Sequence, residues 1–169
     1  MFARSLVPPL QLNLQSEIAA LVGKLILVNT AKLVSVVTNM RTAKVEYKLG
    51  AKAPSLKSLV SDIKQIDCSG FVRYAMYQAT SGAVIMPDGS WNQDDWCRKQ
   101  GFAAVNYQKT AGTLDHRLRI AFMHGGIGHV WFVLDGQTIE SRGHVGPSRR
   151  DWQTPILFNH ACKCYLLTA

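Results

Sequence analysis

One cysteine and one histidine of this chain stand in the contexts that a cysteine nucleophile needs. Cys68 lies directly before an apolar pattern with helical period, and His129 opens a pattern typical of a strand. The thiolate is the attacking form of cysteine, and the unpaired N–H groups of a helix N-terminus favour it. A histidine within hydrogen-bonding reach completes the activation. The two residues therefore predict nucleophilic catalysis by Cys68 with His129 as its base.

The segment around Cys68 predicts a helix with the thiol at its tip. Asp67 is a natural N-cap, and the apolar face of the helix begins only at Phe71. The backbone N–H groups at such a tip, beside Ser69, can form an oxyanion hole. Gly70 in the first turn lets another segment approach closely. The alternative is a buried cysteine that packs as a small apolar side chain, which is the commoner fate of a single cysteine.

The segment around His129 predicts a β-hairpin. Residues 129–134 and 137–142 have strand character, and Asp135-Gly136 between them is a strong type I′ turn signal. His129, Trp131 and Val133 then share one face of the first strand. We expect that face to turn toward the helix that carries the cysteine.

A third polar group usually orients a catalytic histidine. His144 follows the second strand of the hairpin, so it returns close to the level of His129. We therefore predict that His144 orients the imidazole. Its competitors for this role are Glu140 and Asp151.

The order of the remaining elements indicates the fold class. Helical patterns come first, at residues 16–40 with Ser16 as cap and at residues 91–100. Strand patterns follow at residues 118–123 and, as one or two strands, at residues 156–167. Helices followed by strands predict an α+β fold with an antiparallel sheet.

Size and charge limit the possible classes of protein. The 169 residues suffice for one domain, and the apolar runs are too short for a membrane span. The net charge of +8 favours an anionic partner such as an acidic cell-wall polymer, whereas the spread of the charges argues against nucleic acid. Pro8-Pro9 interrupts the N-terminal apolar stretch, so no signal peptide is evident. A protein acting outside the cytoplasm would then need another route of delivery.

The four cysteines are too few for a disulfide scaffold. His160, Cys162 and Cys164 lie close together and suggest zinc, but a second matched cluster is missing. On a strand the two cysteines would share a face and pack, which is the interpretation we favour. We expect neither a metal nor a cofactor.

The chain resembles the NlpC/P60 cysteine peptidases over residues 45–152. Three stretches carry the resemblance most strongly: Asp-Cys-Ser-Gly-Phe-Val at 67–72, Gly-His-Val at 128–130, and Glu140-Ser141 followed by His144. Tyr47-Lys-Leu-Gly50 is similar to the family's Tyr-x-x-Gly segment. Met86-Pro87, with Ser90 shortly after, is similar to its Leu-Pro-Arg-x-Ser stretch. The chain departs from the pattern at Gly50-Ala51, at Asp88 and in a longer basic insert before the cysteine.

The resemblance implies a papain-like fold in which the cysteine helix packs on an antiparallel sheet. Residues 1–44 would be a helical extension of the same globule, and residues 45–169 the catalytic domain. Carried over by position, Cys68 is the nucleophile, His129 the base and His144 the orienting residue. Tyr47 would lie beside the thiol and assist the oxyanion or the substrate, together with Ser69.

The resemblance also implies an activity, because the family typically cuts amide bonds in peptidoglycan stem peptides, often between D-glutamate and diaminopimelate. We expect an amidase that reaches the periplasm or cell wall of a target bacterium. It would act as an antibacterial effector with a secretion-system carrier and an immunity protein, or as a phage-type lytic enzyme. The alternatives are a thiol acyltransferase or amidase with another substrate, and a non-enzymatic wall-binding module. The intact Cys68 and His129 argue against the last.

Overall fold

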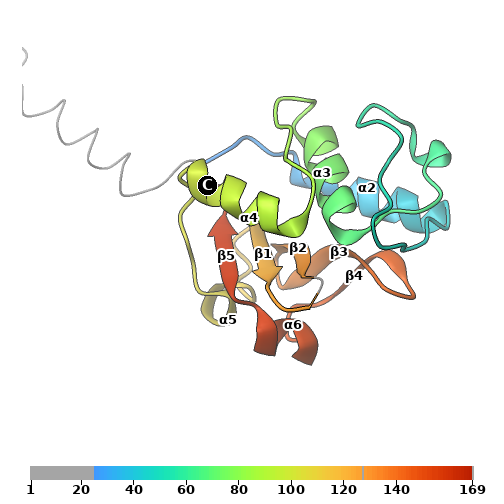
Figure 1. Cartoon of the computed structure of the whole chain (residues 1–169). Coiled ribbons are helices and arrows are strands. Elements are labelled where there is room, and N and C mark those ends of the chain that lie inside the picture. Colours follow the sequence, from blue (N-terminus) through green and yellow to red (C-terminus); the bar gives the residue numbers. More distant parts are fainter. Residues whose placement is uncertain (1–24, 127, 169) are drawn as a thin grey trace, which may run out of the picture.

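The computed structural model describes residues 25–126 and 128–168, which form helices packed on one antiparallel sheet (Figure 1). The helices are α2 (Thr30–Thr42), the 3₁₀ turn η1 (Val60–Asp62), α3 (Cys68–Ala79), α4 (Ser90–Lys99), α5 (Tyr107–Thr110) and α6 (Pro155–His160). The strands are β1 (Arg119–Met123), β2 (His129–Leu134), β3 (Gln137–Arg142), β4 (Gly146–Asp151) and β5 (Lys163–Leu166).

The sheet has five strands in the order β4-β3-β2-β1-β5, and neighbouring strands run antiparallel. Helices α2, α3 and α4 lie on one side of it, and α5 and α6 lie on the other (Figure 1). The predicted α+β class with an antiparallel sheet is therefore confirmed. None of the described helices is long and apolar enough to cross a membrane.

Strand β2 divides the core between the two faces of the sheet. Val130 and Phe132 pack in the same cluster as the buried residues of α3, whereas Trp131 packs with Tyr107 and Leu157 on the other face. Side chains alternate along a strand, so His129 belongs to the Trp131 face. The prediction that this face turns toward the cysteine helix is wrong, because the even-numbered residues of β2 are the ones that cover α3.

Helix α3 begins as predicted. The Asp67 side chain accepts a hydrogen bond from the backbone N–H of Gly70 at 2.6 Å, which makes Asp67 the N-cap. Phe71, Val72 and Ala75 are fully buried and fix the helix on the sheet. Cys68 is consequently the first residue of a helix that is held at both its cap and its apolar face.

Helix α2 is shorter than the predicted helix at residues 16–40. It begins at Thr30, where the Asn29 side chain caps the first turn, and residues 25–29 are not helical. The N–H of Ile26 instead donates to the carbonyl of Leu167 at 2.9 Å, so this segment runs beside the end of the chain. Ser16, the predicted cap, lies outside the described residues.

The buried side of α2 joins the same core cluster as α3, through Leu33, Val36, Val37 and Met40. Packing in this core cluster explains why the β-branched residues are tolerated in the helix. The division into an extension at 1–44 and a domain at 45–169 stays a prediction.

Two C-terminal elements differ from the prediction. Residues 155–160 form helix α6 rather than a strand, because Pro155 occupies the first helical position, where its fixed backbone angle favours a helix. Strand β4, which contains Pro147, was not predicted. It forms at an edge of the sheet, where a proline is tolerated.

Gly146 fixes the β3–β4 hairpin against the segment that follows α2. Its φ angle is 76°, in the left-handed region, and a Cβ placed on it would lie 2.3 Å from the carbonyl oxygen of Val45. Only glycine allows that approach. The contact sets one boundary of the surface around Tyr47.

We expect Gly146→Ala to lower the free energy of unfolding by about 2 kcal/mol or more, through backbone strain and overpacking. Gly143→Ala in the same hairpin is the control, because a Cβ at Gly143 meets no atom within 4 Å. It should change stability by less than about 0.5 kcal/mol. Urea denaturation of both variants tests this, and equal stabilities would contradict it.

Candidate active site

A polar network holds the N-terminal tip of α3. Asp67, which is 4% exposed, accepts hydrogen bonds from the Ser69 hydroxyl at 3.1 Å and from the N–H of Gly50 at 3.1 Å. Lys52 forms an ion pair with Asp67 and donates to the Ser69 hydroxyl at 3.1 Å. The network ties residues 50–52 to the helix tip. It also engages the Ser69 hydroxyl, so the predicted part of Ser69 in binding the oxyanion or the substrate stays a prediction.

Gly70 makes the approach of residues 50–52 possible. A Cβ at this position would lie 2.8 Å from Cδ of Lys52 and 3.0 Å from the carbonyl oxygen of Ala51. The sequence predicted such a close approach, and the structure identifies the segment that makes it.

Cys68 lies at this tip with its residue surface 6% exposed. Within the described part of the chain, the backbone N–H groups of Cys68 and Ser69 make no hydrogen bond. These two donors of the first helical turn remain free beside the thiol. They can stabilise negative charge on a substrate oxygen, as an oxyanion hole does.

His129 lies between the thiol and a carboxylate. As the first residue of β2 it stands at the end of the sheet, where its imidazole interacts with Cys68. Its Nε2 lies 2.8 Å from Oε2 of Glu140. The ring stacks on Trp131, with 5.4 Å between the ring centroids. Because Nε2 faces Glu140, Nδ1 is the nitrogen left for the thiol.

The surroundings of His129 favour its charged form. Burial lowers its pKa, but the contacts with Cys68 and Glu140 outweigh burial and raise the pKa from 6.5 to about 9. The imidazolium is thus the stable form at neutral pH. A thiolate beside an imidazolium is the reactive state of a cysteine nucleophile.

Glu140 is fully buried and every part of its carboxylate is engaged. Arg150 donates to it from Nε at 2.6 Å and from Nη2 at 3.1 Å, and the Thr138 hydroxyl donates at 2.9 Å. Burial raises the pKa of Glu140, but the hydrogen bonds with His129 and Arg150 lower it by more. The pKa of Glu140 therefore lies below its ordinary value. The carboxylate is ionised and holds the imidazole in a single orientation.

The contact that we predicted for His144 is made by Glu140. Phe132 pairs with Ile139, so the next position along the hairpin brings Glu140 beside Trp131, on the face that also carries His129. His144 lies beyond the end of β3, in the turn between β3 and β4, with a φ angle of 63°. Its exposed side chain makes no hydrogen bond or ion pair with the described residues.

Asp151, the other competitor, is exposed and its side chain accepts a hydrogen bond from the backbone N–H of Gln153 at 2.7 Å. Its side chain therefore stabilises the turn that follows β4 and lies outside the site. The structure brings together Cys68, His129 and Glu140.

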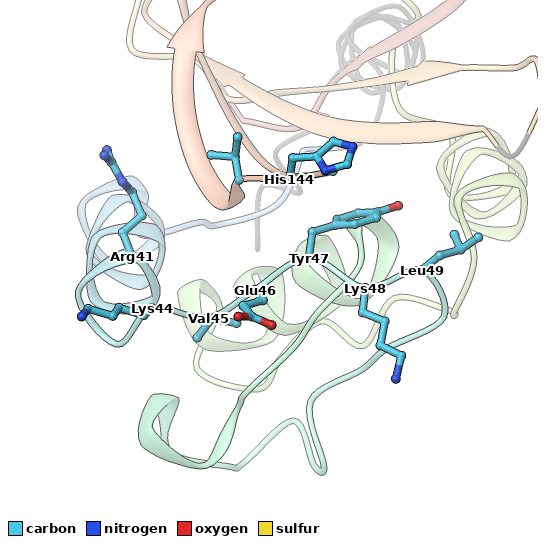
Figure 2. A pocket seen from close by; sticks show the side chains of 10 residues that line it. Arg41, Lys44, Val45, Glu46, Tyr47, Lys48, Leu49 and His144 are labelled. Carbon is cyan, nitrogen blue, oxygen red and sulfur yellow. The ribbon is translucent and has the colours of Figure 1, made fainter.

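Tyr47 lies close to the thiol. Burial raises its pKa first, and the negative charges of Cys68 and Asp67 raise it further, which places its hydroxyl in their field. Tyr47 and His144 also line one hollow of about 770 Å³, and Figure 2 shows their rings on facing segments. His144 thus lines the surface next to the thiol and makes no hydrogen bond with the imidazole of His129.

Sequence reasoning missed the partners that stabilise the site. Lys52, Thr138 and Arg150 were not singled out, although polar residues at alternate strand positions, 138 and 140, are unusual on a buried face. That alternation was the signal that could have ranked Glu140 above His144.

Comparisons with known proteins find several distant structural similarities, and two of them are to NlpC/P60 family proteins. A crystal structure of an NlpC/P60 family protein from Bacillus cereus ATCC 10987 is 23% identical over 60% of this chain and 32% of its own, with a TM-score of 0.44. A protein described as similar to lipoprotein, NLP/P60 family, from Staphylococcus aureus subsp. aureus Mu50 is 15% identical over 80% of this chain and 42% of its own, with a TM-score of 0.48.

Both similar structures are NlpC/P60 family proteins, the family that the sequence motifs resemble. The chain spans less than half the length of either. No family model matches the sequence. No curated protein matches it either.

We expect Glu140→Gln to lower kcat about a hundredfold or more, because a neutral amide cannot stabilise the imidazolium. Asp151→Asn removes the same charge from an exposed side chain outside the site and should leave kcat within about twofold. Steady-state kinetics on any cleaved amide substrate, with thermal melting as a check of folding, compares the two. A larger loss of kcat in His144→Gln than in Glu140→Gln would return the orienting role to His144.

Proposed function

We propose that this chain is a cysteine amidase that hydrolyses amide bonds in peptidoglycan stem peptides. The observation that carries the proposal is the position of His129 between the thiol of Cys68 and the buried carboxylate of Glu140. An ionised, fully engaged carboxylate behind a charged imidazole is an arrangement that a purely structural cysteine does not need.

In the first half of the reaction the Cys68 thiolate attacks the carbonyl carbon of the amide. The developing oxyanion is stabilised by the free N–H groups at the tip of α3. The His129 imidazolium then gives its proton to the departing nitrogen, the C–N bond breaks, and a thioester on Cys68 remains. Glu140 keeps the imidazole aligned throughout this proton transfer.

In the second half a water molecule attacks the thioester. Neutral His129 accepts a proton from that water, and the thiolate leaves as the carboxylic acid product is released. The proton on His129 regenerates the initial ion pair. Each group therefore returns to its starting form after one turnover.

The resemblance to NlpC/P60 peptidases and the net charge of +8 support a peptidoglycan substrate, which is anionic. The D-glutamate–diaminopimelate bond is the one we assign to this site. We also propose that it acts in the periplasm or cell wall of a target bacterium, as an effector with an immunity protein or as a phage-type lytic enzyme. Transfer of the acyl group to another amine, in place of water, would use the same thioester.

The test is to incubate purified protein with peptidoglycan sacculi and to separate the products by chromatography and mass spectrometry. We expect new amine and carboxyl termini within the stem peptides, and no release by Cys68→Ala. Cys162→Ala is the matched control, because that cysteine is exposed and lies before β5, outside the site. The absence of cleavage by the unaltered protein, or cleavage by Cys68→Ala, would contradict the proposal. Products joined to an added amine would indicate a transferase.

A further inference from the structure

A hollow of about 770 Å³ adjoins the candidate site at Tyr47. Three segments surround it: the end of α2, the chain at residues 44–49, and the tip of the β3–β4 hairpin at residues 143–145 (Figure 2). We call it the basic hollow. The residues that line it are Arg41, Lys44, Val45, Glu46, Tyr47, Lys48, Leu49, Gly143, His144 and Val145.

The charges that line the basic hollow are unbalanced. Arg41, Lys44 and Lys48 are exposed, and none of them forms an ion pair or a side-chain hydrogen bond with the described residues. Glu46 is the one acidic residue among the described residues that line it, and its carboxylate already accepts a hydrogen bond from Gln65 at 3.2 Å. Three cations therefore line a hollow whose described lining holds one carboxylate.

Several cations elsewhere in the described structure are neutralised by carboxylates. Lys52, next to the helix tip, is neutralised by Asp67 and Asp88. Arg98 and Lys99 on α4 both pair with Asp95. Lys57, Lys109 and Lys163 lack such partners too, so the cations of the basic hollow are distinguished by their position around a hollow beside Tyr47, where they remain available to an anion.

The backbone of the basic hollow is held in place. The N–H of Val45 donates to the carbonyl of Met40 at 3.0 Å, and the N–H of Glu46 donates to Lys64 at 2.9 Å. Gly146 packs directly on the carbonyl of Val45. The backbone between Lys44 and Tyr47 is consequently fixed, so an anion bound by side chains that project from this segment gains a defined place relative to Tyr47 and the thiol.

We propose that the basic hollow is a subsite for a free carboxylate group of the substrate, next to the amide bond that Cys68 attacks. A carboxylate matches the unpaired cations in charge, and Arg41 can bind both of its oxygens. The inference rests on the proposed function. It adds that the site selects amides that carry a negative charge beside the scissile bond over the same amides with that charge removed.

The test uses two synthetic stem peptides that differ only at the α-carboxyl group of the γ-linked glutamate, which is free in one and a carboxamide in the other. Calorimetric titration into Cys68→Ala protein measures binding without turnover. We expect the carboxylate peptide to bind about tenfold more tightly, with a preference that falls as salt rises.

The variant Arg41→Gln/Lys48→Gln, in the Cys68→Ala background, should lose that preference. Arg41→Lys/Lys48→Arg, which preserves both charges, should keep most of it. Lys109→Gln/Lys163→Gln removes the same charge from exposed residues outside the hollow and should leave the preference unchanged. Thermal melting of each variant confirms that it is folded.

Equal affinity for the two peptides, or a preference that survives Arg41→Gln/Lys48→Gln, would overturn the subsite. Failure of the subsite proposal is distinguishable from failure of the proposed function. Cleavage of both peptides at equal rates by the unaltered protein would retain the amidase and refute the subsite. Preferential binding of the carboxylate peptide without any cleavage would retain the subsite and refute the amidase.

Discussion

The buried carboxylate of Glu140 is the interaction on which the site depends. It is fully buried between His129 and Arg150, and removal of one partner of such a buried pair costs about 3–5 kcal/mol. Three strands meet at this point, because His129 lies on β2, Glu140 on β3 and Arg150 on β4. The same contacts that join the strands hold the imidazole toward Cys68, so stability of the sheet and orientation of the base are coupled.

On the helix side of the site, Asp67 has the part that Glu140 has on the sheet side. Its carboxylate caps α3 and also binds Lys52, Ser69 and the backbone of residue 50, so the thiol is presented by a rigid tip. Ser141 joins the two halves, since its hydroxyl donates to the carbonyl of Ile66 at 2.9 Å. The site is therefore assembled from helix and sheet by polar contacts that are buried on both sides.

Much of this arrangement could be predicted from the sequence, because the decisive signals are local. Asp67 as cap, Cys68 at the tip and the turn at Asp135-Gly136 follow from short patterns, and the turn residues have the positive φ angles, 49° and 71°, that a type I′ turn requires. The choice between Glu140 and His144 depended on the register across the sheet. Sequence separation along the hairpin suggested His144, whereas alternation of faces selects Glu140. Strand β4 depends on pairing with β3 and was missed for the same reason, whereas helix α6 has a local signal in Pro155 that the strand prediction overlooked.

The central claim is that His129 is held as an imidazolium between Cys68 and the ionised carboxylate of Glu140, and an NMR titration of the His129 imidazole tests it most directly. The account predicts a midpoint near 9 in the unaltered protein and lower midpoints in Cys68→Ala and Glu140→Gln. Because the pKa in the folded state exceeds the ordinary value of 6.5, the stabilisation from this group is fully present below pH 6.5 and is lost as the pH rises through about 9. A midpoint near 6.5 that neither substitution changes would contradict the account.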